Sequence, residues 1–209
     1  MIRLITGCSR AGSKFTYKLL NELGLKIGHE GMKRDGTCSH YANGLKVKYP
    51  KLYDDYKFNV VLHQVRNPIK NIESLTTMQY WDYSNRGDHL PSGPSVEFVA
   101  PLEVMPFLKS DNIILQCARY WYHYNKNAEN MSEWTYPIEK LVKDEEIFSE
   151  FCFRMGIDSV PNQVTVPKEN NSRKNWPNRK KVTWKELEYL DKDLTEKIKT
   201  ISKKWGYDD

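Results

Sequence analysis

The segment "IRLITGCSRAGSKFTYKLLNELG" (residues 2–24) contains the pattern of a strand, a glycine-bounded loop and a helix in immediate succession. Residues 2–6 are an apolar run typical of a short buried strand, and Gly7 and Gly12 enclose a tight turn. Residues 13–24 then place apolar side chains at helical spacing and end at a glycine. Backbone N–H groups in such a turn and the positive end of the helix converge on one anion. The segment therefore predicts a P-loop-type phosphate-binding unit.

This loop departs from the loop that binds ATP or GTP. Its glycines have the spacing of the pattern G-x-x-x-x-G-K-[ST], but the next two residues, Ser13 and Lys14, stand in reverse order. The clearest further strand, residues 58–65, is followed by Arg66 rather than by a carboxylate that could hold magnesium. A cation at that place repels a metal ion and attracts a second phosphate. The sequence therefore favours a phosphorylated ligand that is bound without a metal.

Alternating strand and helix patterns predict a three-layer α/β/α fold with a mainly parallel central sheet. The length fits a single domain that spans residues 1–209. Further strands are expected at residues 25–30, 58–65 and 135–141, and helices at 68–79, 101–109, 111–130, 144–156 and 184–205. The sequence also predicts a loop at 31–40, an interrupted helix at 42–55 and a long lid or binding loop at 80–100. Ligands bind such sheets at the carboxyl ends of the strands, where Gly7, His29 and Arg66 are expected.

Composition narrows the class of protein further. A formal net charge of +5 suits an anionic ligand but also fits an ordinary solvated surface. The four cysteines are widely spaced, which indicates free thiols rather than a disulfide framework or a structural zinc site. No apolar run has the length of a membrane span, and the chain enters its first strand at once, without the pattern of a signal peptide. The expected location is the cytoplasm.

Two of these motifs resemble those of the sulfotransferases that use 3′-phosphoadenosine 5′-phosphosulfate (PAPS). The stretch "GCSRAGSKFTYKLL" (7–20) resembles the family's 5′-phosphosulfate loop, P-[KR]-S-G-T-T-x-[LF], with Arg10 at the Lys/Arg position. "VRNPIKNIESL" (65–75) resembles the signature R-[ND]-P-x-x-x-x-x-S, whose Arg and Ser bind the 3′-phosphate. Later segments that look like family elements are "TYPIEKLVKDEEIFSEFCFRMGI" (135–157) and "LDKDLTEKIKTISKKWGY" (190–207). The resemblance thus extends over most of the chain.

The resemblance implies transfer of a sulfonyl group from PAPS to a hydroxyl or amine acceptor, for example on a carbohydrate. The product of the donor would be 3′,5′-adenosine bisphosphate, and no metal would take part. The residues that the resemblance assigns to the donor are Arg10, Ala11, Gly12, Ser13, Lys14, Phe15, Arg66, Ser74, Ser172 and Arg173. Arg10 and Arg66 would hold opposite ends of the nucleotide. The sequence departs from the family at Lys14, which replaces a hydroxyl, and at "NSRKNW" (171–176), which lacks the family's glycine.

The catalytic base is expected at His29 or Glu30, which follow the second strand close to the phosphate loop. A carboxylate at a comparable place is the base in the heparan-type sulfotransferases, and a histidine accepts a proton near neutral pH. Catalytic roles are therefore assigned to Arg10, Glu30 and His29. The alternative is that His29 and Glu30 only cap the turn between Gly28 and Gly31. His63, in an apolar strand, is expected to be a hydrogen-bonded core residue.

Two other functions fit parts of the sequence. One is a nucleotide or small-molecule kinase with a degenerate Walker loop, and the other is a non-catalytic polyanion-binding protein built on the basic residues 168–185. The aromatic segment 80–98 could stack on a sugar acceptor. Arg66 without an acidic neighbour opposes the kinase, and the small net charge opposes nucleic acid as a partner. The sequence predicts neither the identity of the acceptor nor the oligomeric state.

Overall fold

The computed structural model describes residues 1–40, 57–78, 112–159 and 179–208, and residues 110, 167 and 177 singly. Its strands are β1 (Arg3–Thr6), β2 (Ile27–His29), β3 (Gly36–Cys38), β4 (Val60–Val65) and β5 (Trp134–Pro137). Its helices are α1 (Ser13–Glu22), α2 (Pro68–Leu75), α5 (Ile113–Met131), α6 (Glu145–Arg154), α7 (Trp184–Leu190) and α8 (Lys192–Lys204). The expectations for residues 42–55, 80–100 and 101–109 lie outside the described residues.

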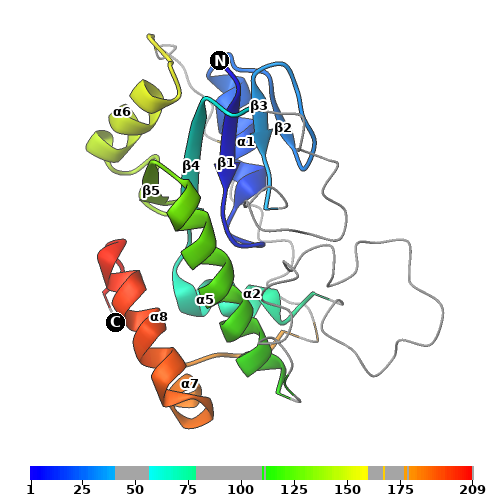
Figure 1. Cartoon of the computed structure of the whole chain (residues 1–209), viewed down its shortest axis with the longest axis vertical. Coiled ribbons are helices and arrows are strands. Elements are labelled where there is room, and N and C mark those ends of the chain that lie inside the picture. The colour runs from blue at the N-terminus through cyan, green and yellow to red at the C-terminus, as the bar shows by residue number, and fades with distance from the viewer. Residues whose placement is uncertain are drawn as a thin grey trace, which may run out of the picture.

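Within the described residues, five strands form an all-parallel sheet in the order β2-β3-β1-β4-β5 (Figure 1). β1 lies at the centre, with Leu4 and Ile5 fully buried between its neighbours. Because the strands are parallel, their carboxyl ends share one edge of the sheet. The loop after β1, His29 at the end of β2 and Arg66 after β4 therefore lie at the same edge, as expected. The α/β class and the parallel sheet are confirmed.

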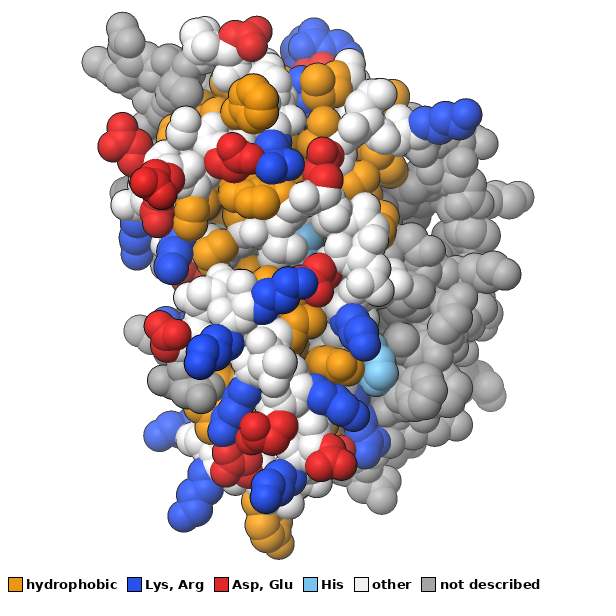
Figure 2. All heavy atoms as spheres, turned by 60° about the vertical axis from the view of Figure 1, so that its left-hand side comes forward, with side chains coloured by type: hydrophobic (Ala, Val, Ile, Leu, Met, Phe, Trp, Pro, Cys, Tyr) orange, Lys and Arg blue, Asp and Glu red, His pale blue; other side chains and the backbone are white. Residues whose placement is uncertain are grey.

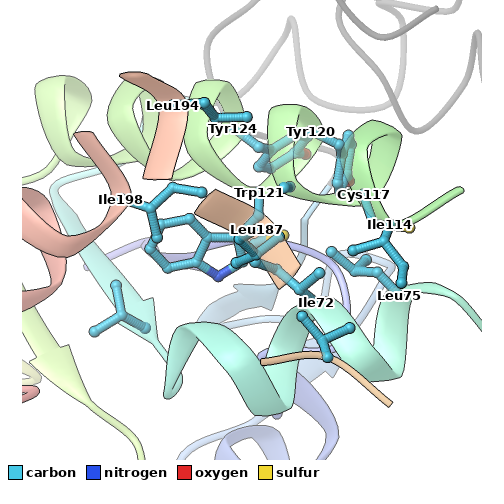
Figure 3. Packing of buried hydrophobic residues seen from close by; sticks show 14 of the residues in the cluster. Ile72, Leu75, Ile114, Cys117, Tyr120, Trp121, Tyr124, Leu187, Leu194 and Ile198 are labelled. Atoms are coloured by element: carbon cyan, nitrogen blue, oxygen red, sulfur yellow. The ribbon is translucent and has the colours of Figure 1, made fainter. Parts of the chain in front are cut away.

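Helices pack on both faces of this sheet, because β4 is apolar on both sides. Leu62 belongs to a hydrophobic cluster with α1 and α6, whereas Val65 belongs to a cluster with α2, α5, α7 and α8. Figure 3 shows Trp121 of α5 at the centre of the second cluster, between α2 and the C-terminal helices. All four cysteines are buried free thiols, as expected. No helix among the described residues has the length and apolarity to cross a membrane.

The sequence-based interpretation missed β3, which lies in the segment expected to be a loop. This strand has no apolar run, and Gly36 makes its pairing with β1 possible. The φ of Gly36 is 133°, and a Cβ there would lie 1.9 Å from the carbonyl oxygen of Arg3. Only a residue without a side chain permits this close parallel contact. The strand is therefore set by steric fit between two backbones, which a hydrophobic pattern does not record.

The single C-terminal helix that was expected is in fact two helices. α7 ends at Leu190, and the next residue, Asp191, caps α8 by accepting a hydrogen bond from the backbone N–H of Leu194 at 3.0 Å. An aspartate competes with the helix backbone for such bonds and favours a helix start. α2 is also shorter than expected and ends at Leu75. The helical period continues across both boundaries, so periodicity alone did not predict them.

Gly7 is the residue at which the loop leaves β1 and touches β4. A Cβ at this position would lie 2.2 Å from the backbone carbonyl oxygen of Gln64, so one of the two strands must move. We expect Gly7→Ala to lower the free energy of unfolding by about 2 kcal/mol or more, as overpacking does. Gly31→Ala is the control, because a Cβ there meets no atom within 4 Å. Urea unfolding measures both, and equal stabilities would contradict this account of Gly7.

Candidate functional site: a cationic loop at the edge of the sheet

Amide side chains from three elements hold the loop between β1 and α1. They are Gln64 of β4, Asn71 of α2 and Asn125 of α5. Gln64 Nε2 donates to the carbonyl of Ala11 at 2.8 Å, Asn71 Nδ2 donates to the carbonyl of Ser9 at 3.0 Å, and Asn125 Oδ1 accepts from the N–H of Cys8 at 3.3 Å. All three amides are buried. Sequence reasoning missed them, although each is a polar residue on an otherwise apolar face, which is the one signal available.

Gln64 also places an amide, and not a carboxylate that could hold magnesium, beside the loop. Its Oε1 accepts hydrogen bonds from the hydroxyl of Thr16 and, at 3.0 Å, from the hydroxyl of Tyr136. Burial raises the pKa of Tyr136 well above its ordinary value, so this hydroxyl stays a donor. An amide oxygen with two donors is poorly suited to bind a metal ion. Gln64 therefore supports the loop through its hydrogen bond to Ala11.

The structure brings together Arg10, Arg66 and Ser74, which the sequence assigned to the nucleotide. Arg66 Nη1 donates to the carbonyl of Arg10 at 3.2 Å, and Arg10 Nε donates to Ser74 Oγ at 3.2 Å. The sequence interpretation placed Arg10 and Arg66 at opposite ends of a ligand. In the structure, the two arginines and the serine form one connected group. The reason is that Arg10 extends toward α2, a choice of rotamer that the motif does not specify.

Arg10 and Glu30 share an unusual backbone conformation. Their φ angles are 68° and 55°, and among the described residues they are the non-glycine positions with positive φ. This conformation costs an L-residue about 1–2 kcal/mol. Strain of this kind concentrates at functional sites, where a particular side chain is needed at a position that favours glycine. Both residues had been assigned catalytic roles from the sequence.

The first turn of α1 presents the remaining predicted donor contacts. Gly12 is the N-cap, with a left-handed φ of 102° and no side-chain cap. The N–H groups of Ser13 and Lys14 begin the helix and have no partner within it. The N–H groups of Ala11 and Phe15 differ, because they donate to the carbonyls of Cys8 (3.1 Å) and Gly12 (2.9 Å). Ser13 and Lys14 therefore fit the predicted anion site better than Ala11 and Phe15 do.

His29 and Glu30 lie beside this turn, as expected. His29 Nε2 is 3.1 Å from Ser13 Oγ, and burial lowers the pKa of His29, an effect that the charge of Glu30 opposes only in part. Burial also raises the pKa of Glu30, but the contacts with His40 and Ser39 outweigh it and lower the pKa overall. At neutral pH, His29 is therefore neutral and Glu30 is ionised. Glu30 accepts from Ser39 Oγ at 2.8 Å and contacts His40 Nδ1 at 2.8 Å.

The loop encloses only a small hollow in this structure. Its volume is about 10 Å³, close to the space of one water molecule. The residues that line it are Ile5, Thr6, Gly7, Cys8, Ala11, Ser13, Ser39, His40 and Gln64. A larger and shallower groove of about 500 Å³ lies between α5 and α8. Its charged residues are three lysines and three acids, and it contains none of the predicted site residues. The chemistry therefore points to the small hollow rather than to the groove.

Glu139 and Tyr207 hold the turn that carries Arg66. Glu139 Oε1 accepts from the backbone N–H of Asn67 at 3.0 Å, and Glu139 Oε2 accepts from the hydroxyl of Tyr207 at 2.6 Å. The same hydroxyl lies 3.2 Å from the carbonyl of Val65. Burial raises the pKa of Tyr207, and the charge of Glu139 raises it further. The last residue of β4 and the N-cap residue of α2 are thus tied, directly or through Glu139, to the C-terminal segment.

The basic segment predicted at 168–185 is described only in part. Ser172 and Arg173 lie outside the described residues, as does the aromatic segment 80–98. Further along, Arg179 forms an ion pair with Glu73 at 2.8 Å, and the N–H of Val182 donates to the same carboxylate at 3.1 Å. Glu73 precedes Ser74 on α2. The described end of the segment is therefore fixed directly beside the group formed by Arg10, Arg66 and Ser74.

Comparison of the chain with protein-family models, with curated proteins and with solved structures gives no significant match. Among the described residues, no group of three or more His, Cys, Asp or Glu side chains is arranged to hold a metal ion.

His63 is a buried core histidine, as expected, and it predicts how stability depends on pH. Its Nε2 donates to Asn125 Oδ1 at 3.1 Å, its Nδ1 accepts from Thr135 Oγ1 at 3.1 Å, and burial lowers its pKa from 6.5 to about 4. The unfolded chain therefore binds one more proton between these pH values, and stability falls as the pH falls from 6.5 to 4. The loss is about 3 kcal/mol.

Urea unfolding between pH 4 and pH 8 measures this loss, and His63→Gln should flatten the dependence by most of that amount. The m value of the wild-type protein is the control, since a constant m value shows that only stability changes. An equally steep dependence in the variant would assign the effect to other groups.

The left-handed backbone at residue 10 allows the energetic cost of backbone strain to be measured separately from the role of the Arg10 side chain. We expect Arg10→Gly to be about 1 kcal/mol more stable than Arg10→Ala, because both lose the side-chain contacts and only alanine keeps the strain. Thermal unfolding of the two variants gives this difference directly. Equal stabilities of the two variants would contradict a φ of 68° at residue 10.

Proposed function

We propose that the protein is a PAPS-dependent sulfotransferase. The observation that carries the proposal is the contact between the two phosphate signatures, in which Arg10 meets Ser74 and Arg66 meets the backbone of Arg10. The paired residues are 64 and 56 positions apart in sequence. A chance occurrence of either motif would not require the two to converge. The two signatures converge at the carboxyl edge of a parallel sheet, and this edge is where such folds bind ligands.

The electrostatics of this group favour a ligand with more than one phosphate. Arg10 and Arg66 each bring a guanidinium group to this place, and guanidinium groups form strong charge-assisted hydrogen bonds with phosphate oxygens. We assign one phosphate to Arg66 and Ser74 and the other to the first turn of α1, with Ser13 and Lys14. Arg10 stands between these two places and reaches both phosphates. The arrangement suits a nucleotide phosphorylated at both its 3′ and 5′ positions.

In the proposed reaction, an acceptor oxygen attacks the sulfur of PAPS in line with the bond to the 5′-phosphate. The negative charge that develops on the leaving phosphate is stabilised by Arg10, by Lys14 and by the N–H groups of the α1 turn. The acceptor hydroxyl approaches from the β2–β3 side, where His29 and Glu30 lie. No step uses a metal, since the cations that balance the phosphate charge belong to side chains.

The alternatives receive less support. A kinase needs a carboxylate at the end of a neighbouring strand to hold magnesium, but Arg66 follows β4, and the oxygen of Gln64 within β4 accepts two hydrogen bonds. A polyanion-binding surface needs clustered charge of one sign, but Figure 2 shows Lys and Arg side chains interspersed with Asp and Glu over the face that carries α6 and α8. In the basic segment, Arg179 is already paired with Glu73.

Binding of 3′,5′-adenosine bisphosphate in the presence of EDTA tests the proposal. Isothermal titration should give tight binding by the wild-type protein and weaker binding by Arg10→Ala and Arg66→Ala, about 10- to 100-fold each, because each loses a charge-assisted hydrogen bond. Ser74→Ala should weaken binding by about tenfold or less. The double variant Arg10→Ala/Arg66→Ala should lose less than the sum of the two single changes in free energy, because both residues hold one ligand.

Arg154→Gln is the matched control, since it removes one positive charge from α6, where Arg154 pairs with Glu150. It should leave the affinity unchanged. Binding of ATP only in the presence of magnesium, or a control variant as weak as the loop variants, would refute the proposal.

A further inference from the structure

The cluster behind the loop contains a contact between a carboxylate and a histidine that the roles assigned to His29 and Glu30 do not use. Glu30 Oε1 is 2.8 Å from His40 Nδ1, and Glu30 Oε2 accepts from Ser39 Oγ at 2.8 Å. The side chains of His40 and Glu30 are 12% and 21% exposed, so the pair is largely screened from water. Residues Ser39 and His40 directly follow β3, which places them at the same edge of the sheet as the loop.

This contact fixes the tautomer of His40. An ionised carboxylate can only accept hydrogen bonds, so the proton of the contact must belong to Nδ1. In a neutral imidazole the other nitrogen, Nε2, then carries the lone pair and is the atom that can accept a proton. When it does so, the resulting imidazolium lies 2.8 Å from the negative charge of Glu30. A carboxylate, a histidine and a reacting hydroxyl in this order are the arrangement of a general base oriented by a third group.

His29 lacks this arrangement. Its Nε2 is the nitrogen nearest to Ser13 Oγ, at 3.1 Å, and the same Nε2 is the nitrogen that lies 3.8 Å from Glu30. Glu30 therefore does not orient His29 through the opposite nitrogen. The ring of His29 also lies 5.4 Å from the ring of Tyr17 in a tilted arrangement, and His29 does not line the hollow enclosed by the loop. His40 does line that hollow, together with Ser13, Ala11 and Gly7.

We infer that His40 is the general base of the proposed sulfonyl transfer and that Glu30 is a positioning residue that acts through it. The inference rests on the proposed function. The acceptor O–H bond breaks as its proton passes to His40 Nε2, while the oxygen forms a bond to sulfur. The bond between sulfur and the bridging oxygen breaks, and its electron pair remains on the 5′-phosphate of 3′,5′-adenosine bisphosphate. Protons, charges and electrons balance without a further reactant.

The assay must not depend on an unidentified acceptor, so water serves as one. Release of sulfate from labelled PAPS follows the same bond changes with a water molecule as the nucleophile. We expect His40→Gln to lower kcat for this hydrolysis by about 100-fold or more, which is the usual contribution of a general base. Glu30→Gln should lower it by a smaller factor. Affinity for 3′,5′-adenosine bisphosphate should be unchanged in both variants, and His123→Gln, a change of the same kind on α5, is the control.

A pH profile separates a positioning role from a merely structural one. The titratable groups that interact with His40 are Glu30 and His29 at the end of β2, and Lys14 at the start of α1 and Cys38 in β3 interact with these two residues in turn. Removing the charge of Glu30 destabilises the imidazolium, so the acid limb of the kcat profile should move to lower pH in Glu30→Gln. In the wild-type protein, NMR of the imidazole nitrogens should show His40 as the Nδ1–H tautomer, a measurement that needs no variant and no activity.

The outcomes distinguish the two proposals. If the wild-type protein neither binds 3′,5′-adenosine bisphosphate nor hydrolyses PAPS, the sulfotransferase proposal fails and the role of His40 fails with it. If the wild-type protein does both but His40→Gln keeps the wild-type rate, only the inference about His40 is wrong. Loss of rate in His29→Gln together with a normal rate in His40→Gln would assign the base to His29. An Nε2–H tautomer for His40 would equally overturn the inference.

Discussion

The contact of the loop backbone with β4 at Gly7 is the constraint on which the site depends. A single atom added at this position would collide with the carbonyl of Gln64, 57 residues further along the chain. The contact brings the end of β1 next to the end of β4, and the side chain of Gln64 then braces Ala11 from the same strand. Arg10 and Arg66 meet because their two strands are held this closely. The charge arrangement is thus a consequence of backbone packing rather than of attraction between the side chains.

Several local features at the carboxyl edge of the sheet oppose folding. Two non-glycine residues have left-handed backbones, and three buried amides replace apolar contacts. Each feature opposes folding, and each is offset by hydrogen bonds from a different element. Natural sequences keep such local conflicts where function requires them. Their concentration at the carboxyl edge, and not in the two apolar clusters, supports the view that this edge is the functional part of the molecule.

The strands β1 and β4 could be predicted because each is an apolar run, and α1, α5 and α6 because each has an apolar stripe. β3 could not be predicted, since it depends on Gly36 fitting against Arg3 rather than on hydrophobic pattern. The residues of the candidate phosphate site were predictable because their spacing forms a motif. Gln64, Asn71 and Asn125 were not, because a polar residue in a buried element reveals its role only when its partner is known. The meeting of Arg10 and Ser74 depends on a rotamer, which a sequence does not encode locally.

The bond between Tyr207 and the turn that carries Arg66 has a consequence for the order of folding. The hydroxyl of Tyr207 contacts the carbonyl of Val65, which lies 142 residues earlier in the sequence. It also contacts the carboxylate of Glu139, which lies between these two residues in the sequence. During synthesis on the ribosome, all five strands of the described sheet emerge well before this tyrosine does. A nascent chain can therefore assemble its sheet while the turn next to Arg66 still lacks one of its supports. The candidate site would then be completed as a late event of maturation, coupled to the docking of the C-terminal helix.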